Sequence, residues 1–147
     1  MASSVQNKQP TQLLVGIDVG STTAKIAVMD AASHEVLMRR YVRHHAQQAN
    51  CLKNLLAELD QQFGGIPMRA ALCGSGGAAL AEALDLPYVQ EVVANSLAVG
   101  AHYPTARTAI ELGGQDAKMI FFKYDKEANR LSVADMRMNG SCAGGTG

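Results

Sequence analysis

Two short segments of the chain carry an acid, a glycine turn and a lysine in the same order, and this chemistry suits a bound phosphate. The first reads DVGSTTAK, from Asp18 to Lys25. An acid at the end of a buried strand can hold a hydrated Mg²⁺, which binds few protein carboxylates and keeps several waters. Gly20 allows the backbone to approach a phosphate, and the hydroxyl and N–H groups of residues 21–23 can surround it. Lys25 adds positive charge unless it points to the far face of its strand. Alone, the segment fits an ordinary turn between strands equally well.

The second segment reads ELGGQDAK, from Glu111 to Lys118, and repeats the order strand, acid, glycines and lysine. A single Gly-Gly turn would be weak evidence, but the pair predicts two jaws of a phosphate clamp. The first segment is not a Walker loop, because the pattern GxxxxGK[ST] is absent and a hairpin rather than a helix is expected after it. The sequence therefore predicts that two turns far apart in the chain share one phosphate site.

A third segment reads MNGSCAGGTG, from Met138 to Gly147, and places Cys142 among small residues at an expected helix start. The positive end of a helix favours the thiolate, and a thiolate favours ligation of a metal or cluster. A lone cysteine is more often a buried structural thiol. One cysteine cannot complete a metal site, so a site here needs a partner chain or residues beyond Gly147.

One further glycine-rich segment matches GxGxxA, from Gly74 to Ala79, with Glu91 at a distance suited to a ribose contact. A dinucleotide fingerprint normally follows the first strand of its unit, whereas a meander precedes this segment. We therefore interpret it as a tight turn that lines the same cleft. We expect Cys51 and Cys73 to be packing residues, and the histidines show no metal-ligand spacing.

The spacing of apolar residues predicts the elements that hold these segments. The apolar run Leu13–Asp18 predicts a buried central strand, and strands at 24–30 and 35–42 extend it to a meander. Apolar residues at helical spacing predict a helix over 52–63, closed by a Gly-Gly stop. The other expected elements are a strand at 68–73, helices from 76 to before 87 and at 91–103, and strands at 108–112, 118–122 and 131–136. The fold class is α/β, and the order strand, acid, glycine turn and hairpin occurs twice.

Composition excludes several classes of protein. With 147 residues the chain is about one domain long, and 13 basic residues balance 13 acidic ones, so no basic face argues for nucleic acid. Aromatic residues are scarce and glycine counts 14, which suits an α/β protein with tight turns around a ligand. No apolar run is long enough to predict a membrane span, and no signal peptide is evident. Three scattered cysteines argue for a reducing cytoplasm.

Together, DVGSTTAK, ELGGQDAK and MNGSCAGGTG resemble the BadF/BadG/BcrA/BcrD-type ATPase family, which includes activators of 2-hydroxyacyl-CoA dehydratases. The resemblance implies a ribonuclease-H-like fold of the actin, sugar kinase and heat-shock chaperone type, with ATP and Mg²⁺ between two lobes. It also implies a homodimer whose two chains share one four-iron four-sulfur cluster. ATP hydrolysis would then pass a low-potential electron from a donor such as ferredoxin or flavodoxin to a dehydratase or reductase.

The resemblance assigns roles residue by residue. Asp18 matches the acid that holds Mg²⁺ and positions water, Gln115 is the second catalytic candidate, and Cys142 matches the first cluster cysteine. Nucleotide-binding candidates are Gly20, Ser21, Thr22, Thr23, Lys25, Glu111, Gly113 and Gly114. Three positions depart from the common pattern: Glu111 stands where Asp is frequent, Asn95 where His is frequent, and CAGGTG replaces CAAGTG.

The expected organisation is a disordered lead-in at 1–11, a first ATPase lobe at 12–105 and the start of a second lobe at 106–147. Because the second cluster cysteine and an adenosine-binding segment are absent, we expect the chain to be a fragment that binds ATP weakly and hydrolyses it negligibly. Two alternatives stay open. A small-molecule, sugar-type kinase would leave Cys142 without a role, and a non-catalytic nucleotide-binding module would show no ATP turnover.

Overall fold

A four-stranded sheet forms the first half of the molecule. The computed structural model describes residues 9–113 and 116–139. The sheet contains β1 (Leu13–Val19), β2 (Thr23–Asp30), β3 (Val36–Arg43) and β4 (Met68–Cys73), in the spatial order β3-β2-β1-β4. Strand β1 is antiparallel to β2 and parallel to β4. The expected meander and the central position of the first strand are therefore confirmed.

The core of this half lies on one face of the sheet. Alternate residues of β1 point into it, and Leu13, Val15, Ile17 and Val19 are all buried. Helix α1 (Gln48–Phe63) covers this face with a stripe of buried leucines at helical spacing, namely Leu52, Leu55 and Leu59. The apolar run of β1 indicates a strand buried on both faces, but Gly16 on the other face is exposed.

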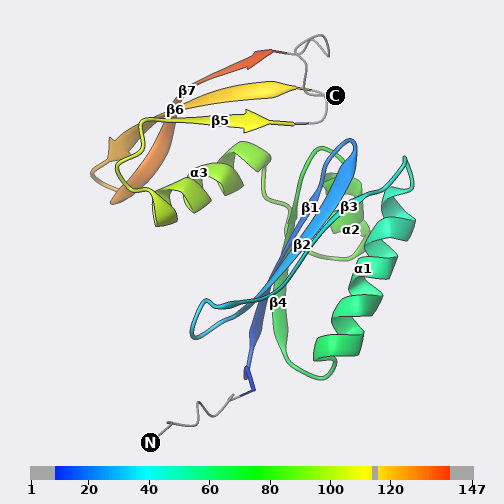
Figure 1. The fold of residues 1–147 in the computed structure, drawn as a ribbon. Helices are drawn as coiled ribbons and strands as arrows, with labels where there is room; N and C mark the ends of the chain where they lie inside the picture. The colour runs from blue at the N-terminus through cyan, green and yellow to red at the C-terminus, as the bar shows by residue number, and fades with distance from the viewer. Residues whose placement is uncertain (1–8, 114–115, 140–147) are drawn as a thin grey trace, which may run out of the picture.

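Two short helices connect this sheet to a second one. Helix α2 (Gly77–Ala83) follows β4, and helix α3 (Glu91–His102) follows a short parallel bridge between Leu72 and Tyr88. The second sheet is a meander of β5 (Thr108–Leu112), β6 (Ala117–Asp125) and β7 (Arg130–Asn139). The strands of the second sheet run across the direction of the first, and the β1–β2 turn lies close to the end of the second sheet where β5 ends and β6 begins (Figure 1).

Helix α3 belongs to the core of the second sheet. Val92 and Val99, seven residues apart on one side of the helix, pack against Ile120, Phe122 and Leu131. Figure 1 shows α3 lying along this sheet rather than along the first. The segment 12–105, which the sequence groups as one lobe, therefore contributes its last helix to the second core.

The remaining expectations agree with the structure to within a few residues at each element end, except that β6 and β7 are longer than the expected strands. No helix among the described residues is long and apolar enough to span a membrane. The expected lead-in lies mostly outside the described residues. The segment that contains Cys142 also lies outside them, apart from Met138 and Asn139 at the end of β7.

Candidate active site

The two hairpin tips face each other across a polar cleft. Both predicted phosphate jaws line it, together with the turn after β4. Its described lining residues are Asp18, Gly20, Ser21, Thr22, Thr23, Lys25, Ser75, Glu91, Glu111, Gly113, Asp116 and Lys118. Ser75 lies in the glycine-rich segment Gly74–Ala79, which we interpret from the sequence as a turn lining this cleft. Gly114, Gln115 and Cys142 lie outside the described residues.

The first jaw is the β1–β2 hairpin. Asp18 near the end of β1 is directly opposite Lys25 on β2, and Lys25 Nζ donates to Asp18 Oδ2 at 2.6 Å. The Gly20 N–H donates to the Thr23 carbonyl at 2.9 Å and closes the turn. The lysine therefore lies on the cleft side of its strand, which settles the orientation that the sequence leaves open.

The second jaw repeats this geometry in the β5–β6 hairpin. Glu111 is directly opposite Lys118, just as Asp18 is opposite Lys25, and the Lys118 Nζ to Glu111 Oε1 distance is 3.7 Å. The Gly113 N–H donates to the Asp116 carbonyl at 2.8 Å. Both turns thus carry the same backbone bond and the same acid–lysine pair, so the repeat seen in the sequence is also a structural repeat.

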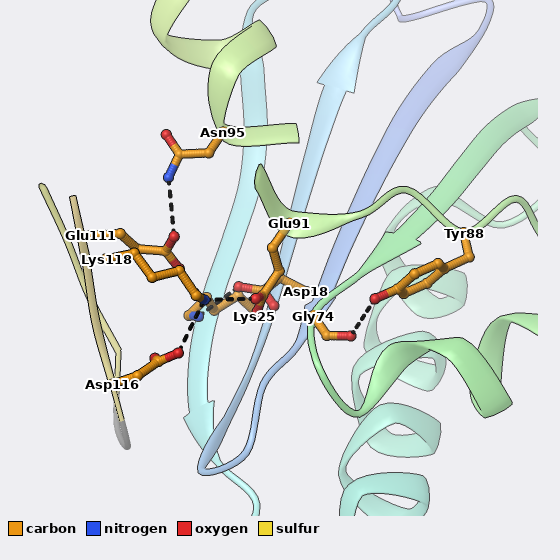
Figure 2. A network of polar contacts seen from close by, with 9 residues as sticks. All are labelled: Asp18, Lys25, Gly74, Tyr88, Glu91, Asn95, Glu111, Asp116 and Lys118. Carbon is orange, nitrogen blue, oxygen red and sulfur yellow. Dashed lines mark hydrogen bonds and ion pairs between the residues drawn. The ribbon is translucent and has the colours of Figure 1, made fainter. Parts of the chain in front are cut away.

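The two lysines differ in their surroundings. The side chain of Lys25 is 39% exposed, whereas that of Lys118 is 10% exposed. Lys118 Nζ lies 2.9 Å from Glu91 Oε2 and 3.4 Å from Asp116 Oδ2, in addition to Glu111 (Figure 2). Burial alone would lower the pKa of Lys118, but the hydrogen bond to Glu91 and the charges of the three carboxylates outweigh it and raise the pKa.

The two carboxylate oxygens of Asp18 differ in their hydrogen bonding. Oδ2 accepts from Lys25, while Oδ1 is buried and has no hydrogen-bond partner among the described residues. A buried acceptor without a partner is costly and marks a place where a ligand, ion or water can bind. Mg²⁺ takes only one or two protein carboxylates alongside phosphate and water oxygens. Asp18 Oδ1 is therefore suited to bind a Mg²⁺ or one of its water ligands.

Gly74 packs closely against Asp18 Oδ1. Its φ of +95° lies in the left-handed region, and an added Cβ would meet Asp18 Oδ1 and the Val19 carbonyl oxygen well inside 3.0 Å. Tyr88 anchors the turn by donating its hydroxyl to the Gly74 carbonyl at 3.1 Å, as Figure 2 shows. Glycine is thus required both by the backbone conformation and by the close approach to the acid.

The charges of the cleft do not favour a bare polyphosphate. Among the described residues, four carboxylates line it, from Asp18, Glu91, Glu111 and Asp116, together with two lysines. Both lysines are already paired with these acids. An anionic ligand therefore needs a divalent cation to enter, or a change in the partners of the lysines.

Glu91, Asp116 and Lys118 join the site although none of them is among the catalytic or nucleotide-binding candidates from the sequence, where Lys118 is only the lysine of the second jaw. Glu91 is considered there only as a ribose contact, whereas the structure places it at the start of α3 as the nearest partner of Lys118. Asn95, one helical turn later, donates to Glu111 Oε2 at 3.5 Å. The signal for Lys118 was available, because it stands at the same distance from Glu111 as Lys25 does from Asp18. Glu91 had no local signal.

The two described cysteines show no sign of ligand chemistry. Cys73 is half-buried directly beside Asp18 in the sheet. Burial, and then the charges of Asp18 and Glu91, raise its pKa to about 11, so the thiol is protonated at neutral pH. Cys51 lies half-buried in α1 against the first core. Within residues 9–113 and 116–139, no three histidine, cysteine or carboxylate groups are grouped to hold a metal ion by themselves.

Comparison with known proteins identifies the family. The model of the BadF/BadG/BcrA/BcrD ATPase family matches residues 15–147. The chain belongs to this family. One relative of this chain is the uncharacterized protein MJ0004 of Methanocaldococcus jannaschii. The two are 28% identical over an alignment that covers 92% of this chain and 51% of the relative.

Two solved structures share the fold of this BadF/BadG/BcrA/BcrD-type chain. Component A of the Acidaminococcus fermentans (R)-2-hydroxyglutaryl-CoA dehydratase superposes with a TM-score of 0.68 at 21% identity, covering 89% of this chain and 48% of that one. The activator of the Clostridium difficile 2-hydroxyisocaproyl-CoA dehydratase, with bound ADPNP, gives 0.63 at 21% identity, covering 89% and 47%. The fold is therefore the ribonuclease-H-like fold of actin-type ATPases. The chain spans about half the length of these proteins.

Proposed function

We propose that the whole protein hydrolyses ATP and uses it to deliver a low-potential electron to a 2-hydroxyacyl-CoA dehydratase or a related CoA-substrate enzyme. The observation that carries this proposal is the pair of matching acid–lysine turns on opposite sides of one cleft. Membership of the ATPase family supports it, as does the likeness of the fold to an activator that binds ADPNP.

The first jaw would bind and orient the phosphates and the attacking water. The turn at 20–23 offers hydroxyl and N–H groups, and Lys25 lies beside the acid that would orient the water. In the hydrolysis, a water oxygen bonds to the γ-phosphorus, the bond to the β,γ-bridging oxygen breaks, and ADP, phosphate and a proton leave. Such reactions depend mainly on positioning and on neutralising charge. Mg²⁺, when bound, would neutralise phosphate charge, and Asp18 Oδ1 is the described atom that fits it.

The second jaw would bind from the other lobe. Gly113 and Gly114 would bring the backbone close to a phosphate, with Gln115 as a further water-positioning candidate. Glu111 is one methylene longer than the aspartate frequent in the family, and here Lys118 and Asn95 both engage its carboxylate. Lys118 has three acidic partners to exchange when phosphate enters, so closure of the cleft would rearrange this cluster.

The electron would come from an iron–sulfur cluster held between two copies of the whole protein. Cys142 is the proposed ligand in this chain, since Cys73 is half-buried beside Asp18 in the sheet and Cys51 is half-buried in α1 against the core. A four-iron four-sulfur cluster needs four thiolates, so each chain must supply a second cysteine. A reduced donor of the ferredoxin or flavodoxin type would load the cluster, and the dehydratase component would accept the electron.

Anaerobic reconstitution with iron and sulfide tests the cluster. We expect the wild-type whole protein to bind about four irons per dimer with the matching visible absorbance. Cys142→Ser should lose most of both, while Cys51→Ser, the matched control in α1, should keep them. Cys51→Ser should also keep basal ATP turnover, because Cys51 packs in α1 against the first core.

Two results would count against the proposal. A Cys142→Ser variant with full iron and absorbance would make this thiol a packing residue and remove the activator assignment. Wild-type protein that turns over ATP only with a small alcohol substrate, and binds no iron, would favour the sugar-type kinase instead.

A further inference from the structure

His44 lies directly beneath the turn of the first jaw. It follows β3, and its side chain is buried with 3% exposure. Its ring Nε2 lies 3.0 Å from the Gly20 carbonyl oxygen, and its backbone N–H donates to the Thr22 carbonyl at 3.2 Å. One residue directly after β3 thus contacts two carbonyls of the turn, those of Gly20 and Thr22.

These two contacts set the orientation of two peptide planes. The described chain contains no cis peptide bond, so each amide N–H points opposite to the carbonyl in the same plane. With the carbonyls of Gly20 and Thr22 directed at His44, the N–H groups of Ser21 and Thr23 are directed away from it. Ser21 and Thr23 line the cleft, whereas His44 does not belong to the described lining.

The chemistry of the contact identifies the imidazole as a donor. A backbone carbonyl only accepts hydrogen bonds, so the proton lies on Nε2. The other ring nitrogen, Nδ1, is buried and has no hydrogen-bond partner among the described residues. An imidazole placed in a core only to fill space would cost more than a leucine. The single described polar contact of this ring is therefore its connection to the turn.

We propose that His44 is a positioning residue that locks the turn Gly20–Thr23 in the form that receives phosphate. The proposal rests on the proposed function, since it assigns phosphate binding to this turn. His44 touches no ligand itself. It prevents rotation of the Gly20–Ser21 peptide plane, which would turn the Ser21 N–H away and present a carbonyl oxygen to an anion.

Three variants separate this lock from ordinary packing. In His44→Gln the amide nitrogen lies as many bonds from Cα as Nε2 does, so it can donate to the same carbonyl. In His44→Asn the nitrogen matches only Nδ1 and falls short. His45→Asn makes the same substitution one residue later, at an exposed position with φ of +48°, where asparagine is well tolerated.

The first measurement needs no nucleotide. Long-range ¹H–¹⁵N spectra of the wild-type protein should show a proton on Nε2 of His44. Amide exchange of Gly20 and of residue 44 should be faster in His44→Asn, and close to wild type in His44→Gln and His45→Asn. A wild-type ring without a proton on Nε2 would overturn the proposal even if every variant failed to fold. So would unchanged exchange in a folded His44→Asn protein.

The second measurement is calorimetric titration of the whole protein with Mg²⁺-ADPNP. Loss of one well-placed hydrogen bond should weaken binding about tenfold in His44→Asn. His44→Gln should recover most of that loss, and His45→Asn should bind like wild type. Equal affinity in His44→Asn and wild type would overturn the positioning role. If wild type keeps its Nε2 proton and protected turn but binds no Mg²⁺-ADPNP, the proposed function fails, while the exchange data still decide whether His44 holds the turn.

Discussion

Lys25 and Lys118 occupy equivalent positions in their hairpins, but they differ in burial and in the number of acidic partners. Lys25 is partly exposed and pairs with one acid, whereas Lys118 is almost buried among Glu91, Glu111 and Asp116. Exposed pairs add little stability, but a buried cation shared by several acids leaves uncompensated charge when it is removed. At the residue scale, Lys118 therefore stabilises the cleft, and Lys25 is freer to meet a ligand.

Replacing Lys118 with methionine should destabilise the fold more than the same change at Lys25. Three carboxylates would then face each other without a cation, and we expect a loss of about 1–3 kcal/mol in the free energy of unfolding. Lys25→Met, the matched control, should cost less than about 1 kcal/mol. Urea unfolding at neutral pH measures both, and equal losses would contradict the difference in role.

The pH dependence of this effect has a definite sign. The pKa of Lys118 is raised in the folded protein above its ordinary value of 10.5. Its contribution to stability is therefore fully present below 10.5 and is lost as the pH rises through the raised value. The difference in the free energy of unfolding between wild type and Lys118→Met should be constant near neutral pH and should shrink above pH 10.5.

At the scale of elements, the site depends on how closely the turn after β4 approaches the end of β1. Gly74 in that turn lies against the Asp18 carboxylate and the Val19 carbonyl. The Gly76 N–H also donates to the Val19 carbonyl at 2.8 Å, and Tyr88 ties the turn to the start of α3. The parallel pairing of β1 and β4 brings these groups together, which gives the glycines of the GxGxxA pattern a structural role.

Gly74→Ala should be far more damaging than Gly65→Ala. Both glycines have positive φ, +95° and +84°, but an added Cβ at Gly65 would meet nothing within 4 Å. We expect Gly65→Ala to cost about 1 kcal/mol of backbone strain, and Gly74→Ala to cost at least about 3 kcal/mol because the clash adds to it. Thermal and urea unfolding provide the comparison. Similar stabilities for the two variants would show that the turn can move away from Asp18.

For the whole molecule, the sequence was sufficient to predict the elements, the repeated jaws and the shared cleft. Each jaw is local, because a strand, an acid, a glycine turn and a lysine within eight residues specify one hairpin. The packing of α3 was not local. The apolar residues of this helix lie on more than one of its sides, and Val93 and Leu97 are about half exposed. No single apolar stripe therefore indicated which sheet the helix would cover. Glu91 entered the site only through that packing.

Contacts between residues far apart in the chain escaped prediction for the same reason. Lys118 and Glu91 lie 27 residues apart, and His44 reaches Gly20 across 24 residues. Nothing in the local pattern of either residue marks these partners. They follow from the register of β2 and β3 and from the packing of α3 on the second sheet, which only the folded chain determines.

Calorimetric titration of the whole protein with ADPNP, with and without Mg²⁺, tests the central claim that the two jaws form a Mg²⁺-nucleotide clamp around Asp18. Because four carboxylates line the cleft, binding should require Mg²⁺. Asp18→Asn should weaken Mg²⁺-dependent binding at least about tenfold, the loss expected for one charged contact. Asp135→Asn, an exposed acid on β7, is the matched control and should bind like wild type. Equal affinity in the presence of a chelator, or unchanged Mg²⁺-dependent binding by Asp18→Asn, would contradict the account.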